Sequence, residues 1–211
     1  MTRRVRIGVV DYGAGNLVSI DQALTAVGAD VQLIREAEAL RGIDALIVPG
    51  VGAARPAMDR LQSHGLVEPI RAWLAADRPF LGICLGLQLL FESSTELGGA
   101  EGLGLADGRV DRLAAGGLKL PQIGWNSVSW QHQSPLVEGL PNPCPMYHVH
   151  TYAVSSPDVL GTATYGEEFV TAVERAPLYG VQFHPEKSGP HGLRLLSNFA
   201  RICARAYVRA A

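Results

Sequence analysis

The segment from Phe80 to Phe91 constrains the fold of this chain more than any other stretch. It starts as a short apolar run, typical of a buried parallel strand, and ends with apolar residues at helical spacing. Between these parts lie Gly82, Cys84 and Gly86, in the pattern Gly-x-Cys-x-Gly. A strand that turns sharply into a helix leaves little room beside the turning residue, and small neighbours two positions away permit that bend. The pattern therefore predicts that the Cys84 side chain is pushed out over the end of a sheet.

This arrangement follows the logic of the G-x-S-x-G nucleophile elbow, with sulfur in place of oxygen. A helix N-terminus stabilises a thiolate, and the N–H of Leu85 is expected to point to where a developing oxyanion binds. The alternative is a buried apolar cysteine, which is how most lone cysteines behave. We interpret Cys84 as a candidate nucleophile.

The rest of the chain narrows the class of protein. Its 211 residues suffice for one domain, which we expect to span residues 1–211, and its net charge of −2 implies no nucleic-acid partner. The first apolar run, Ile7–Val10, is too short for a signal peptide or a membrane span. Three cysteines without paired spacing predict no disulfide framework, no metal site and a reducing, cytoplasmic location. The glycine turn at residues 13–15 lacks the marks of a phosphate-binding loop, and we expect no cofactor.

The first half of the chain alternates strand-like runs with helical segments, which favours a parallel sheet covered on both faces. Shorter β-like pieces separated by turn residues follow, and these favour antiparallel strands. The predicted fold class is therefore α/β, with a parallel-core mixed sheet flanked by helices on both faces and added antiparallel strands. Besides the segment that ends at Cys84, the expected strands are Val5–Val10, Val31–Ile34, Ala45–Val48, Val128–Trp130, Tyr147–Tyr152, Val159–Ala163, Phe169–Val173 and Tyr179–Phe183; a first helix is expected after Asn16 and a last one over Leu193–Tyr207.

The sequence Pro-Gly-Val-Gly at Pro49–Gly52 comes at the end of the third expected strand. Parallel sheets bind their ligands at the carboxyl ends of their strands, and glycines there allow backbone N–H groups to approach a substrate closely. A plain strand-to-helix turn is the alternative, which these residues alone leave open.

Six histidines compete for the role of a base beside Cys84. His184 follows the strand expected at Tyr179–Phe183, and the carboxylate of Glu186 can hold its second ring N–H and fix its tautomer. His150 lies in an expected strand and is a candidate to line a pocket. The order of nucleophile first and base later matches that of nucleophile-elbow enzymes, which favours His184.

These motifs resemble those of the class I, or triad, glutamine amidotransferases, whose signature is present at Gly82–Gly86 and His184–Glu186. Within this family the chain is similar to the glutaminase subunits of imidazole glycerol phosphate synthase, of histidine biosynthesis. Gln122 and Ile123 stand where His-Met is expected, a departure that touches no triad residue. The resemblance implies a flavodoxin-like amidotransferase fold and spans nearly the whole chain, through the segments Asp11–Asn16, Pro49–Gly52, Pro121–Asn126, Tyr147–Tyr152 and His184–Ser188.

The resemblance also implies roles for individual residues. Cys84 would attack the side-chain amide of glutamine, His184 would transfer the protons, and Glu186 would orient His184. The Cys84 thioester would then be hydrolysed to glutamate. The implied oxyanion hole consists of Val51, Gly52 and Leu85, with a peptide at Val51 that turns to present its N–H. The implied contacts to the amino-acid end of glutamine are Gln88, Glu96, Thr151 and Tyr152.

Free ammonia is lost to water or inactivated by protonation, so a small glutaminase without a second substrate site requires a partner. The resemblance implies a heterodimer with a (β/α)₈-barrel cyclase subunit, which uses the ammonia to make imidazole glycerol phosphate and AICAR. For Trp125, a position in the core is an equally good interpretation, since tryptophan serves both roles. The residues expected at the interface are Tyr12, Asn16, Trp125, Tyr147 and Lys187.

Three other functions remain open at this point. A sibling amidotransferase subunit of pyridoxal phosphate or anthranilate synthesis would keep the same triad and supply another synthase. A non-catalytic binding subunit would keep the fold, although an intact set of Cys84, His184 and Glu186 argues against it. A cysteine peptidase of related topology is the weakest alternative.

Overall fold

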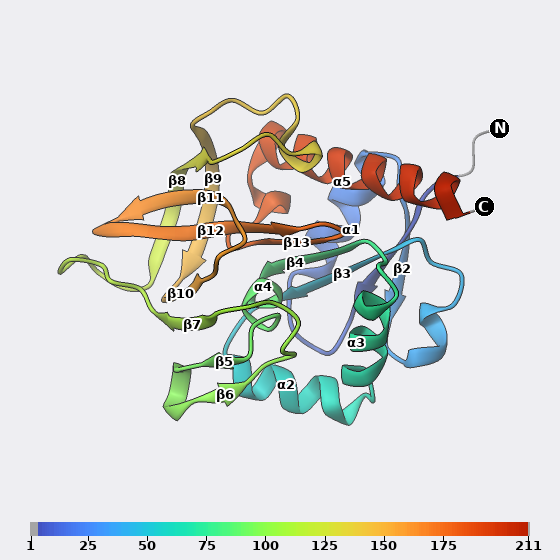
Figure 1. Ribbon diagram of the computed structural model, residues 1–211, viewed down its shortest axis with the longest axis horizontal. Helices are drawn as coiled ribbons and strands as arrows, with labels where there is room; N and C mark the ends of the chain where they lie inside the picture. The colour runs from blue at the N-terminus through green and yellow to red at the C-terminus, as the bar shows by residue number, and fades with distance from the viewer. Residues whose placement is uncertain (1–3, 211) are drawn as a thin grey trace.

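The centre of the structure is a parallel sheet. The computed structural model describes residues 4–210, with side chains of the last helix described as far as residue 206 (Figure 1). Five strands lie in the order β2-β1-β3-β4-β13, and every neighbouring pair among them is parallel. Their bounds are β1 (Arg6–Val10), β2 (Asp30–Ile34), β3 (Ala45–Gly50), β4 (Phe80–Cys84) and β13 (Leu178–Val181).

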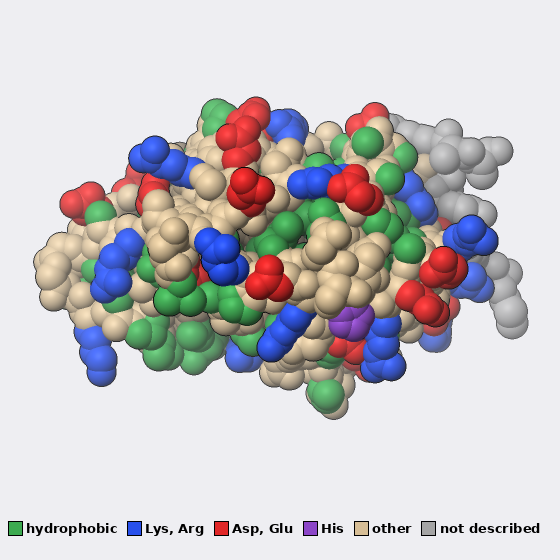
Figure 2. Space-filling model, turned by 90° about the horizontal axis from the view of Figure 1, so that it is seen from below, with side chains coloured by type: hydrophobic (Ala, Val, Ile, Leu, Met, Phe, Trp, Pro, Cys, Tyr) green, Lys and Arg blue, Asp and Glu red, His purple; other side chains and the backbone are tan. Residues whose placement is uncertain are grey.

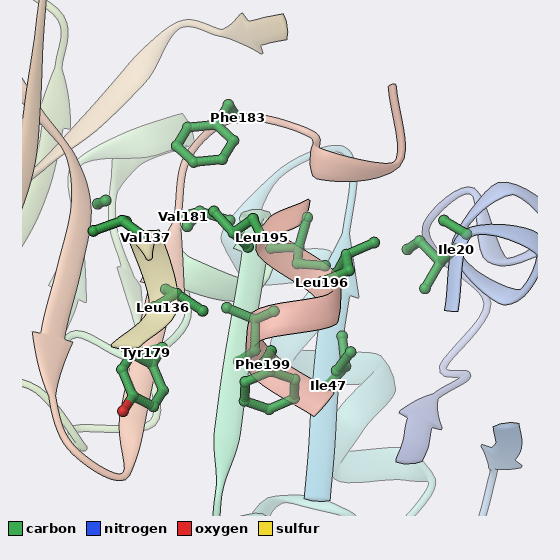
Figure 3. Packing of buried hydrophobic residues seen from close by; sticks show 14 of the residues in the cluster. Ile20, Ile47, Leu136, Val137, Tyr179, Val181, Phe183, Leu195, Leu196 and Phe199 are labelled. Carbon is green, nitrogen blue, oxygen red and sulfur yellow. The ribbon is translucent and has the colours of Figure 1, made fainter. Parts of the chain in front are cut away.

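Helices cover both faces of this parallel part. On one face α1 (Leu17–Ala26) and α5 (Gly189–Ala210) pack with the sheet in one apolar cluster. Apolar residues of α5 three or four positions apart form a stripe, and Figure 3 shows Leu195, Leu196 and Phe199 among the strand residues Ile47 and Val181. On the other face α2 (Ala54–Ser63) and α3 (Val67–Ala75) belong to a second cluster. The strands β1, β3, β4 and β13 are therefore buried on both sides, as their nearly continuous apolar sequences require, while the edge strand β2 is largely exposed.

Beyond β13 the sheet becomes mainly antiparallel. There β12 (Glu167–Arg175) pairs with β13 and leads outward to β10 (Tyr152–Ser155), β7 (Arg109–Arg112), β5 (Ser93–Ser94) and β6 (Ala100–Glu101). A branch runs from β12 through β11 (Val159–Tyr165) and β8 (Gln122–Trp130) to β9 (Cys144–His150). In Figure 1 this branch forms the end of the molecule away from both chain termini. The predicted α/β class with added antiparallel strands is confirmed.

The helix predicted after Cys84 is much shorter than expected. Only Leu85–Gln88 forms a helix, α4, which is a single turn. Leu90 and Phe91 lie beyond it and are fully buried, and Phe91 bridges to Ala106. A tight buried turn places apolar residues inward at much the same spacing as a helix does, so the apolar pattern alone did not separate the two.

Other elements also differ from the expected ones. The strand expected over Tyr147–Tyr152 is divided at Thr151 into β9 and β10, which pair with different neighbours. Strands β5, β6 and β7 were not expected from the sequence. A single 3₁₀ turn, η1 (Ala37–Leu40), connects β2 to β3 where a helix was expected, and similar short turns occur at η2 (Glu96–Gly98), η3 (Pro135–Val137) and η4 (Pro185–Lys187).

The outer surface fits the near-neutral charge of the chain. On the face that carries α2, positive and negative side chains are interspersed with apolar ones (Figure 2). Among the described helices, none is long and apolar enough to cross a membrane.

Candidate active site

Cys84 occupies a strained turn between β4 and α4. Its φ and ψ angles are 55° and −110°, a conformation that residues other than glycine rarely adopt. The two flanking glycines are required sterically. A Cβ atom on Gly82 would lie 2.6 Å from the Gly86 carbonyl oxygen, and a Cβ atom on Gly86 would overlap the Val48 carbonyl. The elbow predicted from Gly-x-Cys-x-Gly is therefore present, and because α4 is only one turn long, neighbouring side chains must supply much of the sulfur's environment.

The register of the parallel strands brings the other groups to this sulfur. Gly50 at the end of β3 pairs with Cys84. On the other side Val181 of β13 pairs with Ile83, so the residues after Val181 run past the elbow. Residues far apart in the sequence meet here because parallel strands end at the same edge of the sheet.

His184 and Glu186 form a buried pair beside Cys84. The His184 Nδ1 atom lies 2.8 Å from Glu186 Oε1, and the two side chains are 5% and 1% exposed. The Ser188 hydroxyl donates to the His184 carbonyl, and the His184 N–H donates to the Tyr147 carbonyl. The imidazole is thus fixed from the backbone as well as by its carboxylate.

The charge of His184 follows from these contacts. Burial opposes protonation, but hydrogen bonds to the Cys84 sulfur and to the Glu186 carboxylate outweigh it, and the pKa of His184 is raised from 6.5 to about 10. The imidazole is therefore protonated more readily than that of a free histidine, and it lies within hydrogen-bond reach of the Cys84 sulfur.

A cleft of about 350 Å³ opens over the Cys84 sulfur. It is lined by residues from the elbow, from the end of β3, from the loop before α5 and from the β9–β10 junction. Glu186 lies behind His184 and does not line it. Of the residues singled out from the sequence, the cleft brings together Val51, Gly52, Cys84, Leu85, Gln88, Glu96, His150, Thr151, Tyr152, His184 and Lys187.

Two of the expected substrate contacts are held in place by the backbone. Gln88 Nε2 donates to the Tyr152 carbonyl at 3.0 Å. Glu96 Oε2 accepts from the N–H of Ala54 at 3.1 Å, at the N-terminal end of α2. A carboxylate is favoured at a helix N-terminus, so Glu96 is directed to the cleft although its loop carries no regular strand or α-helix.

The expected interface residues fall into two groups. Trp125 is 59% exposed and makes an edge contact with Tyr147, with ring centroids 6.0 Å apart, so it is not a core residue. Asn16 and Lys187 are exposed as well. Tyr12 is the exception, because it is only 1% exposed and its hydroxyl donates to the Pro49 carbonyl at 2.9 Å. Tyr12 therefore supports the end of β3 from within, and its assignment to a surface is corrected.

The other histidines do not compete with His184. Burial lowers the pKa of His148 to about 3 and that of His150 to about 4, so both are neutral. His150 lines the cleft, as the sequence suggested, with its Nδ1 bonded to the Tyr152 carbonyl and its Nε2 buried without a partner among the described residues. His132 lies on the surface against Glu174.

One residue in contact with Cys84 was missed in the sequence. Gln182 is fully buried, its Nε2 lies 3.7 Å from Cys84 Sγ, and its Oε1 accepts from Gln88 Nε2. The only available signal was a polar residue inside an apolar strand, two positions before His184.

No other part of the described chain offers comparable chemistry. A larger cavity of about 830 Å³ lies between Trp130, Leu140 and Arg205, shares no lining residue with the cleft over Cys84, and has no cysteine in its wall. Within residues 4–210, no group of three or more histidine, cysteine, aspartate or glutamate side chains could hold a metal ion.

Comparison with known proteins agrees with this geometry. The family described as glutamine amidotransferase class-I matches residues 8–203. The imidazole glycerol phosphate synthase subunit HisH of Symbiobacterium thermophilum is 48% identical over 200 residues, which is 93% of this chain and 94% of that protein. The HisH subunit of Wolinella succinogenes is 45% identical over 203 residues, 93% of this chain and 99% of that protein.

Solved structures show the same fold at lower identity. A putative GMP synthase protein from Thermoplasma acidophilum has a TM-score of 0.74 and 22% identity, covering 100% of this chain and 99% of that one. PurLQS from Thermotoga maritima has a TM-score of 0.72 and 16% identity, covering 98% of this chain and 100% of that one. These two likenesses concern the fold alone.

Proposed function

The chain belongs to the class-I glutamine amidotransferases, in the family of HisH subunits of imidazole glycerol phosphate synthase, and from this premise we propose how its residues carry out the reaction. Cys84, His184 and Glu186 are the catalytic residues. The observation that carries this assignment is the position of Cys84, on a strained turn at the base of a cleft and bonded to a buried imidazole–carboxylate pair.

The reaction begins with the Cys84 sulfur. The thiolate attacks the side-chain amide carbon of glutamine, and a tetrahedral oxyanion forms. The imidazolium of His184 then donates its proton to the departing nitrogen, which leaves as ammonia, and a thioester remains on Cys84. Water activated by the now neutral His184 hydrolyses the thioester to glutamate and restores the thiolate. Glu186 keeps the imidazole in the tautomer that serves both steps.

The oxyanion is held by backbone N–H groups. The N–H of Leu85, the first residue of α4, is one donor, and the Val51–Gly52 segment across the cleft supplies the other. Removing one such donor typically costs about 10²–10³ in rate. If the N–H of the Val51–Gly52 segment points to the oxyanion in only one of two backbone conformations, a change between them would control the rate.

The amino-acid end of glutamine is assigned to the opposite part of the cleft. Glu96 carries a negative charge that matches the substrate ammonium, and Gln88 lines the same cleft. Thr151 and Tyr152 complete this part at the β9–β10 junction.

The ammonia is used by a second protein. We assign this partner as a (β/α)₈-barrel cyclase that forms a heterodimer with the chain, receives ammonia through the interface and makes imidazole glycerol phosphate and AICAR. The exposed apolar side chains of Ile123 and Trp125, 64% and 59% exposed, suit such a contact. Asn16, Tyr147 and Lys187 extend the proposed interface. The three cysteines of the chain are free, which suits a reducing cytoplasm.

The test replaces the nucleophile in the two-subunit enzyme. We expect Cys84→Ala to abolish glutamine-dependent synthesis and to leave synthesis from added ammonium salts intact, because the barrel subunit performs the second step by itself. Cys144→Ala is the matched control, since Cys144 is a buried thiol outside the cleft. Glutamine hydrolysis by Cys84→Ala near the wild-type rate would refute the assignment. Ammonium-dependent synthesis of a product other than imidazole glycerol phosphate would assign the chain to a sibling synthase.

A further inference from the structure

Gln182 connects the nucleophile to the wall of the cleft. It follows β13 directly, and its side chain is fully buried between Cys84 and Gln88. Its Nε2 lies 3.7 Å from Cys84 Sγ, and its Oε1 lies 2.9 Å from Gln88 Nε2. The proposed mechanism assigns no role to it.

One backbone carbonyl determines the orientation of both amides. The Tyr152 carbonyl can only accept, so the amide group of Gln88 must turn its nitrogen toward it. The same nitrogen faces Gln182, which must therefore present its oxygen there. The amide nitrogen of Gln182 is then left facing the Cys84 sulfur, which must accept.

This direction of donation matters for the chemistry. A thiol is a weak acceptor, whereas a thiolate accepts strongly. A buried amide N–H that faces sulfur is therefore better satisfied when Cys84 is charged, and an unsatisfied buried donor is costly. The other contact of the sulfur, to the Val149 carbonyl at 3.8 Å, is one that the thiol makes as a donor. The amide favours the attacking form of Cys84 and adds to the effect of the imidazolium on the same sulfur.

The chain of amides has a second consequence in the cleft. Both hydrogens of Gln88 Nε2 are used, one by Tyr152 and one by Gln182. What Gln88 can offer a ligand is therefore its Oε1, an acceptor. An acceptor in the cleft that the Glu96 carboxylate also lines suits a bound ammonium group.

We propose that Gln182 is a positioning residue for glutamine hydrolysis, which donates a hydrogen bond to the Cys84 sulfur and locks Gln88 with its Oε1 toward the cleft. The inference rests on the proposed function of this cleft. It makes two separable predictions, one for the reactivity of sulfur and one for the binding of glutamine.

The experiment compares two variants of Gln182 in the full chain. Gln182→Glu keeps an oxygen toward Gln88 but turns an acceptor toward sulfur. Gln182→Met keeps the length of the side chain, buries no charge and removes both hydrogen bonds. Alkylation of Cys84 by iodoacetamide reports on the sulfur, and kcat and KM for glutamine in the two-subunit enzyme report on turnover and binding.

We expect both variants to lose about 10- to 100-fold in alkylation rate and in kcat, the range for a hydrogen bond to a charged group. We expect KM to separate them. It should stay within about threefold of wild type in Gln182→Glu and rise about tenfold or more in Gln182→Met, where Gln88 is released. A merely structural role would change KM in parallel with stability, and would not produce this split.

Asn198→Asp is the matched control, because Asn198 is a buried amide on α5 that donates to two carbonyls outside the cleft. We expect it to lower the melting temperature while alkylation stays within about twofold of wild type. Wild-type alkylation rates in both Gln182 variants would overturn the inference. If Gln182→Glu does not fold, Gln182→Met alone decides it. Failure of the wild-type chain to hydrolyse glutamine would refute the proposed function instead, whatever the Gln182 variants do.

Discussion

Two neighbouring segments of the cleft differ sharply in how closely other atoms pack against their backbones. The nucleophile elbow, Gly82–Gln88, is buried throughout, and a Cβ atom on Gly82 or Gly86 would collide with backbone. The segment Val51–Gly52, which we propose as part of the oxyanion hole, follows β3 directly and lines the same cleft. There Val51 is 47% exposed, and a Cβ atom on Gly52, whose φ is +96°, would meet nothing within 4 Å.

The boundary between tight and open backbone falls at one peptide. Gly50 pairs with Cys84 and is as confined as the elbow, because a Cβ atom there would overlap the Tyr12 hydroxyl. Two residues later, at Gly52, the chain is free of such contacts. The backbone at the proposed nucleophile is therefore fixed, while the backbone of the proposed oxyanion donor has space to turn. An enzyme that must not waste glutamine is best controlled at the part that can move without disturbing the triad.

The largest expected effect would break the elbow. We expect Gly86→Ala to lower the free energy of unfolding by about 4 kcal/mol or more, because its methyl group has no room beside the Val48 carbonyl. Gly52→Ala is the comparison variant and should cost about 1–3 kcal/mol, from its positive φ alone. Urea unfolding of both chains measures the difference. Equal losses would show that the two backbones are equally confined.

The next effect concerns regulation. We expect the lone chain to be a poor glutaminase and to be stimulated about 10³-fold when the barrel partner is bound together with its ligand. A stimulation of this size needs roughly 4 kcal/mol of transition-state stabilisation. One oxyanion hydrogen bond supplies most of that stabilisation. For this, the ligand must bind more tightly, by a similar free energy, to the conformation in which the Val51 peptide has turned. Gly52→Pro removes an N–H and cannot adopt the φ of +96° found at Gly52, so stimulation should collapse while Cys84 still reacts with a glutamine-like alkylating agent.

The measurement is glutamine turnover by the lone chain, by the complex and by the complex with ligand. Equal turnover in all three wild-type samples would remove the basis for a switch at Val51–Gly52. Full stimulation of Gly52→Pro would place the switch elsewhere.

A smaller effect tests the hydrogen bond from the Tyr12 hydroxyl to the end of β3, next to the Val51–Gly52 segment. Tyr12→Phe deletes the donor to the buried Pro49 carbonyl and should cost about 1–3 kcal/mol of unfolding free energy. Because this bond holds the Pro49 carbonyl and not the peptide at Val51 that is expected to turn, stimulation should change by less than about tenfold. Tyr165→Phe serves as the control, since it removes a hydroxyl-to-carbonyl bond at Lys119, outside the cleft. Complete loss of stimulation in Tyr12→Phe would move the switch to the Tyr12–Pro49 contact.

The smallest expected effect, per pH unit, is the loss of stability at acidic pH that is caused by two buried histidines of β9. His148 and His150 have pKa values lowered to about 3 and about 4, against 6.5 in the unfolded chain. Below pH 6.5 the unfolded chain binds protons that the folded chain cannot, so stability present above pH 6.5 is lost as pH falls through 4 and 3. Each histidine contributes a slope of up to about 1.4 kcal/mol per pH unit. His148→Asn should give a shallower slope between pH 6 and 4.5 in urea unfolding, and an unchanged slope would contradict this cause.

Local patterns in the sequence were sufficient for much of the fold. The buried strands β1, β3 and β4 were predicted because apolar runs between turns have few alternatives. The edge strand β2 was predicted as well, and most of its residues are exposed. The elbow was predicted because Gly-x-Cys-x-Gly expresses a steric requirement at its own positions, and the collisions at Gly82 and Gly86 confirm that requirement. The length of α4 was not predictable, since the residues after it are buried in either conformation.

The residue types required for the chemistry, a cysteine in an elbow and a histidine two residues before a glutamate, are properties of short segments and were determined by the sequence itself. The contacts between those segments were decided by the tertiary structure. The register of β13 against β4 places Gln182 at the sulfur, and the packing of the first loop under β3 buries Tyr12, which had been expected on the surface. The physical reason is that a hydrogen bond between distant residues depends on strand register and on burial, and neither is encoded in the identity of the two residues that form the bond.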